Sequence, residues 1–262
     1  MSIYEELFSV AGKSALVTGG AKGVGAFIAE ALVRAGCRVF VTGRSQEAGA
    51  AFVQRMGAYG ECTFLQHDLS EPAGIQALLV ELGQRAGAVD ILVNNAGTFN
   101  AADIASVRAE DWDTLMGLNL RTPFLLVQGL IPLLSARASL GDPARIINIG
   151  SIGGLMPQSN GAYAYGCSKA AIHQLTRMLA SDLRASNINV NAIAPGFFPS
   201  DMTAGFFDAV PDLEQAMIQK IPAHRLGTAE DIGGMVIFLC SRAGAYLTGT
   251  ITQIDGGYLC AP

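Results

Sequence analysis

Short β-rich segments alternate with longer helical patterns along almost the whole chain of 262 residues. The β-rich segments are bounded by turn residues and lie at 14–18, 37–42, 62–66, 90–94, 144–149, 188–193 and 250–254. Helical patterns fit between them near 23–36, 46–58, 71–86, 110–136, 166–186 and 228–241. Because parallel strands need long crossovers, and such crossovers are right-handed, this order predicts a doubly wound α/β fold.

The sequence predicts one domain, residues 1–262, of the Rossmann-like type. We expect a sheet of seven mainly parallel strands with helices on both faces. The alternation is interrupted near 195–225, where Phe, Pro and Gly are frequent. We expect two short helices there, which form a small flap over a substrate.

Charge and hydropathy exclude several classes of function. A net charge of −5 and a pI near 5.2 argue against a nucleic-acid-binding surface. The mean hydropathy is high, at +0.36, but no unbroken apolar run approaches the ~20 residues of a membrane span. The first ten residues lack the basic and apolar regions of a secretory signal. We therefore expect a cytoplasmic protein without membrane insertion.

A glycine-rich segment, Thr18–Gly25, follows the first predicted strand and opens the first predicted helix. Gly19, Gly23 and Gly25 carry no Cβ, so the backbone can turn sharply and approach a pyrophosphate. The helix N-terminus favours the charge of that group. In this context the segment predicts a dinucleotide site, although a structural turn would show a similar pattern.

The residues after the second predicted strand indicate which dinucleotide is preferred. NAD sites place an acid about 20 residues beyond the glycines, and this chain has Gly43 and Arg44 there. Arg44 and Lys22 can both pair with a 2′-phosphate. The sequence therefore favours NADP(H), with NAD(H) as the alternative.

Two further strand ends carry polar groups. Asp68 can accept a hydrogen bond from an adenine amino group, or it can cap a turn, and the sequence does not separate these roles. Asn94-Asn95-Ala96-Gly97 ends the fourth predicted strand, where amides and close backbone can line a cofactor crevice.

Ser151, Tyr165 and Lys169 form the strongest chemical pattern. Carbonyl reduction needs a proton donor at the oxygen, and a free Tyr, with a pKa of about 10, needs a nearby cation to serve near neutral pH. Lys169 lies one helical turn from Tyr165 and is expected to favour the phenolate. Ser151 ends the fifth predicted strand and can hold the substrate oxygen.

Taken together, these motifs resemble the short-chain dehydrogenase/reductase family, from Thr18–Gly25 through Pro195-Gly196 to Ile254-Asp255-Gly256-Gly257. The resemblance implies that Asn119 is a fourth catalytic residue, which breaks its helix locally and holds a water that continues the proton relay. It also implies that Ser200 reaches the nicotinamide carboxamide. The cofactor-binding residues predicted are Gly19, Lys22, Gly23, Val24, Gly25, Arg44, Asp68, Leu69, Asn95, Ala96, Gly97, Tyr165, Lys169, Pro195, Gly196 and Ser200.

Within the family, RIINIGS at 145–151 and AYAYGCSKAA at 162–171 are most similar to bacterial NADPH-dependent 3-ketoacyl reductases of the rhamnolipid-pathway type. This implies a ketone reductase for 3-oxoacyl or similarly apolar substrates, and a homo-oligomer, tetramer or dimer, that pairs through the helices near 110–136 and 166–186. An acyl thioester carrier is a further implied partner, for which Arg137, Arg177 and Arg184 are the basic candidates.

Two alternatives stay open at this point: an oxidative alcohol dehydrogenase for a steroid, sugar acid or aromatic alcohol, and a nucleotide-sensing protein of the same fold. Phe197, Phe198 and Met202 follow Pro195-Gly196 and, with Ser151 and Tyr165, are the predicted substrate contacts. His67, His173 and His224 have no metal-ligand spacing, so no metal is predicted.

Overall fold

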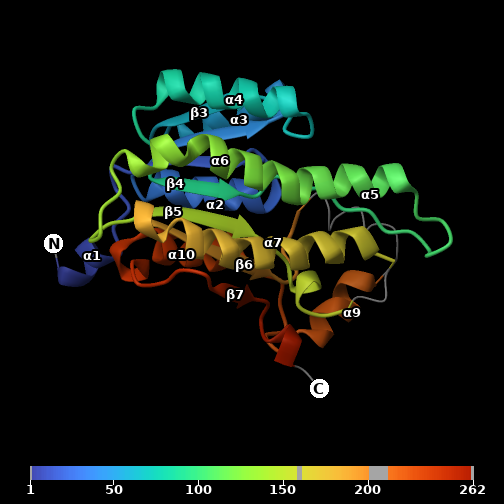
Figure 1. Cartoon of the computed structure of the whole chain (residues 1–262). Coiled ribbons are helices and arrows are strands. Elements are labelled where there is room, and N and C mark those ends of the chain that lie inside the picture. Colours follow the sequence, from blue (N-terminus) through green and yellow to red (C-terminus); the bar gives the residue numbers. More distant parts are fainter. Residues whose placement is uncertain (1, 158–160, 201–211, 261–262) are drawn as a thin grey trace.

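The computed structural model describes residues 2–157, 161–200 and 212–260. Its centre is a seven-stranded sheet in the order β3-β2-β1-β4-β5-β6-β7, and each of its strand pairings is parallel (Figure 1). The strands are β1 (Ser14–Thr18), β2 (Arg38–Gly43), β3 (Cys62–Gln66), β4 (Ile91–Asn94), β5 (Ala144–Ile149), β6 (Ile188–Pro195) and β7 (Ile251–Ile254). The predicted α/β fold is confirmed.

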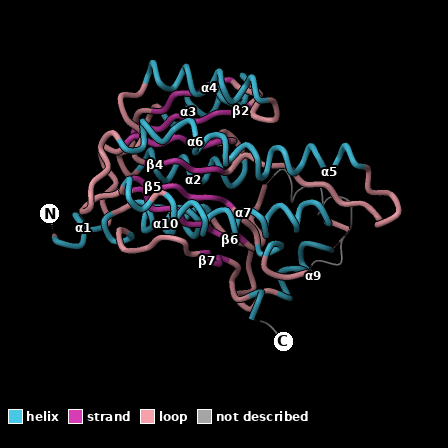
Figure 2. Tube along the Cα trace, in the orientation of Figure 1, coloured by secondary structure: helices cyan, strands magenta, loops and turns pink. Residues whose placement is uncertain are grey.

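Helices cover both faces of the sheet (Figure 2). They are α1 (Ile3–Leu7), α2 (Gly23–Arg34), α3 (Gln46–Met56), α4 (Pro72–Arg85), α5 (Ala109–Met116), α6 (Thr122–Ser135), α7 (Tyr163–Asp182), α9 (Leu213–Lys220) and α10 (Ala229–Cys240). One face carries α2, α3 and α10, and the other carries α4, α6 and α7. The chain reverses its direction of winding between β1 and β4, which are neighbours in the sheet.

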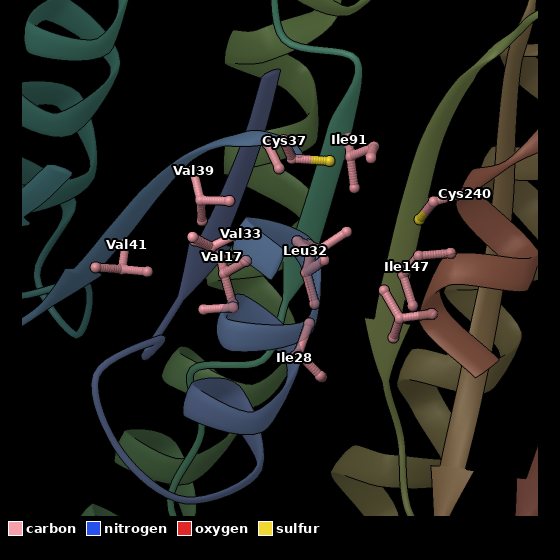
Figure 3. Packing of buried hydrophobic residues seen from close by; sticks show 14 of the residues in the cluster. Val17, Ile28, Leu32, Val33, Cys37, Val39, Val41, Ile91, Ile147 and Cys240 are labelled. Atoms are coloured by element: carbon pink, nitrogen blue, oxygen red, sulfur yellow. The ribbon is translucent and has the colours of Figure 1, made fainter. Parts of the chain in front are cut away.

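Each face has its own apolar core, because strands buried on both sides bear hydrophobic side chains in both directions. On the first face, Val17 of β1 and Val39 of β2 point toward Leu32 of α2 (Figure 3). Alternate residues of the same strands, Leu16 and Phe40, belong to the second core. The sheet is therefore a rigid base for the loops at its carboxyl edge.

The run Ala109–Ser135 is the one helix in the described part of the chain that is long and apolar enough to span a membrane by composition. A five-residue π-helix, Gly117–Arg121, interrupts it between α5 and α6. Leu126 and Leu130 of α6 are buried in the second core. Packing against the sheet thus accounts for part of the apolar character of this run.

The structure corrects several predicted boundaries. The helix expected at 166–186 begins at Tyr163 and ends at Asp182, and the helix expected at 110–136 is divided by the π-helix. Of the two short helices expected near 195–225, the described residues contain α9. The flap prediction otherwise depends on 201–211, which lie outside the described residues, as does Met202.

Candidate active site

A cavity of about 760 Å³ opens at the carboxyl edge of the sheet. In Figure 1 the arrowheads of β4 and β5 point toward this side, where α5 and α9 lie. All sixteen predicted cofactor residues line the cavity: Gly19, Lys22, Gly23, Val24, Gly25, Arg44, Asp68, Leu69, Asn95, Ala96, Gly97, Tyr165, Lys169, Pro195, Gly196 and Ser200. So do Ser151, Phe197 and Phe198. The topology thus brings these distant segments together.

The glycine-rich loop is joined to the end of β4 by hydrogen bonds. The backbone N–H groups of Asn95 and Ala96 both donate to Thr18 Oγ1, at 2.9 Å each. The Asn95 side-chain amide donates to the carbonyl oxygens of Thr18, at 2.9 Å, and Gly19, at 3.2 Å. Asn95 therefore fixes the glycine-rich loop to the end of β4, and this role accounts for the Asn at this strand end.

Gly25 shows why the loop needs glycine. A Cβ at this position would overlap the Gly19 carbonyl oxygen and the Asn95 side-chain nitrogen. Gly19 and Gly23 have positive φ angles, +62° and +52°, which side-chain-bearing residues rarely adopt. Gly23, Val24 and Gly25 at the start of α2 line the cavity, and the N-terminus of a helix favours an anionic pyrophosphate.

Two cationic residues, Arg44 and Lys22, are among those that line the cavity. Arg44 follows Gly43 directly, and Lys22 precedes α2. Asp68 lies in the same region and accepts hydrogen bonds from Ser70 N, at 3.0 Å, and Ser70 Oγ, at 2.7 Å. These bonds, with Arg44 nearby, lower the pKa of Asp68. Asp68 thus caps a turn and also lines the cavity, so both roles that the sequence left open are compatible.

Ser151, Tyr165 and Lys169 meet in the same cavity. Tyr165 and Lys169 lie one turn apart on α7, and the Lys169 ammonium is 5.5 Å from the centre of the Tyr165 ring. The Ser151 side chain is hydrogen-bonded to Tyr165. Lys169 Nζ donates to the Ile149 carbonyl oxygen at 2.8 Å, which ties the ammonium to the end of β5.

Burial shifts the pKa values of Tyr165 and Lys169 in opposite directions. Burial raises the pKa of Tyr165, and the hydrogen bond with Ser151 opposes this rise only in part. Burial also lowers the pKa of Lys169 from 10.5 to about 8. That Lys169 favours the phenolate during the reaction stays a prediction.

Asn119 lies in the π-helix, where the predicted local break of the helix occurs. Its side chain does not line the cavity. Instead Oδ1 accepts from the Thr98 N–H, at 2.8 Å, while Nδ2 donates to the Thr98 carbonyl, at 2.9 Å, and to Ser168 Oγ, at 3.1 Å. The side chain thus holds the loop after β4 against α7, which the sequence did not indicate.

Aromatic side chains complete the wall near Tyr165. Phe197 lines the cavity, and its ring packs edge-to-face on Tyr258, with 5.1 Å between centroids. Phe198 is buried in the first core and covers Gly227, so this residue of the predicted flap packs against the body of the protein. Sequence reasoning missed Phe99, which lines the cavity beside Tyr165. Tyr163 is exposed and is not among the residues that line the cavity.

The described residues contain no group of three or more His, Cys, Asp or Glu side chains that could hold a metal ion. His173 is buried one turn beyond Lys169, next to Gly150. Burial lowers the pKa of His173 to about 4, and the nearby Lys169 acts in the same direction. This imidazole is therefore neutral near physiological pH.

Comparisons with known proteins agree with this arrangement. A family model described as enoyl-(acyl carrier protein) reductase matches residues 19–259. The chain is 47% identical to the rhamnolipids biosynthesis 3-oxoacyl-[acyl-carrier-protein] reductase of Pseudomonas aeruginosa, over 96% of this chain and 98% of that protein. It is 35% identical to 3-oxoacyl-[acyl-carrier-protein] reductase FabG of Escherichia coli, over 94% and 97% of the two chains.

Two solved structures extend the comparison. The Pseudomonas aeruginosa RhlG/NADP active-site complex superposes with a TM-score of 0.93 at 47% identity, covering 97% of this chain and 98% of that one. A gluconate 5-dehydrogenase from Burkholderia cenocepacia in complex with NADP and tartrate gives a TM-score of 0.89 at 29% identity, covering 99% and 100%. The chain, as its motifs predict, belongs to the short-chain dehydrogenase/reductase family.

Proposed function

We propose that this protein is an NADP(H)-dependent ketone reductase. The observation that carries the proposal is the convergence of Ser151, Tyr165 and Lys169 on the same cavity as the glycine-rich loop and the cations Lys22 and Arg44. A nicotinamide cofactor, when bound, supplies or accepts the hydride. The chain itself must then bind the carbonyl oxygen and move a proton.

In this proposal Ser151 and Tyr165 hold the carbonyl oxygen, and the Tyr165 hydroxyl donates the proton. The Ser151 side chain accepts a hydrogen bond from Gly153 N at 3.0 Å, which fixes its position. Lys169 stabilises the phenolate that remains, because its ammonium lies over the same ring. Asn119 acts through the π-helix and the Thr98 loop, and the water that it is expected to hold stays a prediction.

The proposed cofactor preference depends on the cations in the cavity. The residues that line it include the cations Lys22 and Arg44, and Gly43 stands where an acid would bind a free ribose. A 2′-phosphate can form charge-assisted hydrogen bonds with both cations. The NADP complexes of the two structural relatives support the same preference.

We propose a 3-oxoacyl or similarly apolar ketone as substrate. The curated relatives are named as 3-oxoacyl reductases, and Phe99, Ile152 and Phe197 give the cavity apolar walls. The alternatives are oxidation of an alcohol, supported by the gluconate dehydrogenase relative, and nucleotide sensing without chemistry. The intact Ser151, Tyr165 and Lys169 set argues against the latter.

An acyl carrier remains a proposed partner, but the basic residues expected to dock it are not all suitably placed. Arg137 pairs with Asp90, which directly precedes β4, and Arg184 opens the short 3-10 helix Arg184–Ser186 that leads into β6. Both therefore lie at the starting edge of the strands, opposite the cavity. Arg177 is exposed on α7 and is the remaining candidate of the three.

The test of function is NADPH oxidation with a panel of 3-oxoacyl thioesters, simple ketones, a 2-enoyl thioester and a sugar acid. We expect turnover with the ketones, faster with NADPH than with NADH. Turnover with only the enoyl thioester would mean that the enzyme reduces a C=C bond rather than a ketone. Turnover with none of these substrates would support the sensing alternative.

We also propose a homo-oligomer that pairs through α5, α6 and α7. A groove on these helices is lined by Asp113, Met116, Gly117, Leu120, Arg121, Phe124, Ala171, Gln174, Leu175 and Met178. Phe124 and Met178 are 42% and 55% exposed, so two large apolar side chains lie at the surface of the same groove. Light scattering should give a dimer or tetramer.

The five free thiols fit the proposed cytoplasmic location.

A further inference from the structure

Phe99 packs directly on the proposed proton donor. Its ring lies edge-to-face on Tyr165, with 5.1 Å between centroids and 69° between planes. Both rings line the cavity. Edge-to-face aromatic pairs favour one mutual orientation, so Phe99 restricts the rotation of the Tyr165 ring.

The loop that carries Phe99 is held at both ends. On one side, Thr98 is fixed through both its N–H and its carbonyl by the Asn119 side chain. On the other side, Ala102 N donates to the Gly161 carbonyl at 3.1 Å. A Cβ on Gly161, which has φ +74°, would lie 2.5 Å from the Ala102 carbonyl oxygen, so this contact requires glycine. Phe99 therefore stands on a loop that is fixed relative to α7.

The position of Phe99 also affects what can bind. Ile152 and Phe197 line the same cavity, and Phe197 is held in turn by Tyr258. A carbonyl placed at Ser151 and Tyr165 would thus have an apolar ring beside one of its substituents. Such a wall favours an apolar substituent, because burial of alkyl surface against it removes that surface from water.

We propose that Phe99 has two roles in the reaction proposed above: it positions the Tyr165 ring, and it forms the wall that selects ketones with an extended apolar substituent. The first role acts on every substrate, because each needs the same hydroxyl. The second acts only on substrates long enough to reach the ring. Phe99 is therefore a positioning and specificity residue that motif comparison does not reveal.

The experiment compares Phe99→Ala and Phe99→Leu with the wild-type enzyme. The substrates are the N-acetylcysteamine thioesters of a short and a long 3-oxo acid, with NADPH. Phe99→Ala should lower kcat about tenfold for both substrates and raise KM about 10- to 100-fold for the long one only. Phe99→Leu, which keeps an apolar wall but has no ring edge, should restore KM for the long substrate while kcat stays low.

Tyr246→Ala is the matched control, since this aromatic residue is fully exposed. Tyr246→Ala should leave kcat and KM unchanged for both substrates. The melting temperature and NADPH affinity of each variant show whether the fold and the cofactor site are intact. A lower melting temperature with unchanged kcat and KM for both substrates would mean that Phe99 serves only packing, and would overturn the proposal.

The inference rests on the proposed function, and the two can fail separately. If the wild-type enzyme fails to oxidise NADPH with any of the ketones tested, the proposed function itself is overturned. A wild-type enzyme that reduces both thioesters, with Phe99→Ala equal to it on both, would overturn only the role of Phe99.

Discussion

Lys169 carries a buried charge at neutral pH, so its replacement should stabilise the folded protein while it stops the reaction. The pKa of this residue is lowered from 10.5 to about 8 by burial. At about 1.36 kcal/mol per pH unit, this difference corresponds to about 3 kcal/mol of unfavourable free energy in the folded state. Lys169→Met removes that cost and keeps a flexible apolar chain in the same space.

Part of this gain is lost, because the Ile149 carbonyl oxygen no longer has its donor at 2.8 Å. A buried acceptor without a partner costs about 1–2 kcal/mol. We therefore expect Lys169→Met to raise the free energy of unfolding by about 1–2 kcal/mol at neutral pH, which is a few degrees in melting temperature. Turnover should fall to background, because the phenolate has lost its cation.

The pH dependence of the free energy of unfolding shows whether the buried charge of Lys169 is the cause of the stability difference. Below about pH 8 the lysine is charged in both the folded and unfolded states, so the wild type bears the full cost. Between about 8 and 10.5 the folded state releases its proton while the unfolded state keeps it, so wild-type stability rises with pH. The advantage of Lys169→Met should therefore shrink across this window.

The assay is urea denaturation at fixed protein concentration from neutral pH to about pH 10, with Lys220→Met, an exposed lysine on α9, as control. A Lys169→Met protein that is less stable than the wild type, by an amount independent of pH, would refute the reasoning. It would mean that the Ile149 contact outweighs the cost of desolvation.

Three further variants test the rest of the site. Tyr165→Phe should lower kcat about 100- to 10,000-fold while NADPH titration shows unchanged affinity; retention of most turnover would contradict its role as proton donor. Gly43→Asp combined with Arg44→Ala should shift the ratio of kcat/KM values toward NADH, because a carboxylate repels a 2′-phosphate; a wild type that already uses both cofactors equally would contradict this explanation. Gly25→Ala should weaken NADPH binding about tenfold or more, because the added methyl forces the loop apart, and unchanged affinity by fluorescence titration would show that the loop adapts.

The fold could be predicted because short β-rich segments alternate with helical patterns long enough to connect parallel strands. The start of α7 was predicted too late for a physical reason. Ala162, at its N-cap, makes no side-chain capping bond, so the usual Ser, Thr, Asp or Asn signal is missing. Most of the predicted cofactor residues that line the cavity could be found because they occur just after a strand, whereas Tyr165 and Lys169 were found by their spacing on one helix.

What could not be predicted depends on burial and on contacts between distant loops. The pKa of Tyr165 follows from desolvation, which sequence spacing does not reveal. The clamp of Asn119 on Thr98 joins residues 21 positions apart and holds one end of the loop that carries Phe99. An Asn within a helix and a Phe two residues after a glycine are both common, so neither residue type marks such a role.

The π-helix at Gly117–Arg121 also limits which insertions and deletions this chain can tolerate. Each residue of an α-helix turns it by about 100°, and a π-helical turn contains one residue more than an α-helical turn. Deleting one residue here would restore regular helical bonding while α5 and α6 keep nearly the same faces toward their neighbours, so Leu115 would stay buried. The deletion would instead move Asn119 away from the position in which it binds Thr98. A single-residue deletion in this segment should therefore act on the Thr98 loop rather than on the packing of the two helices.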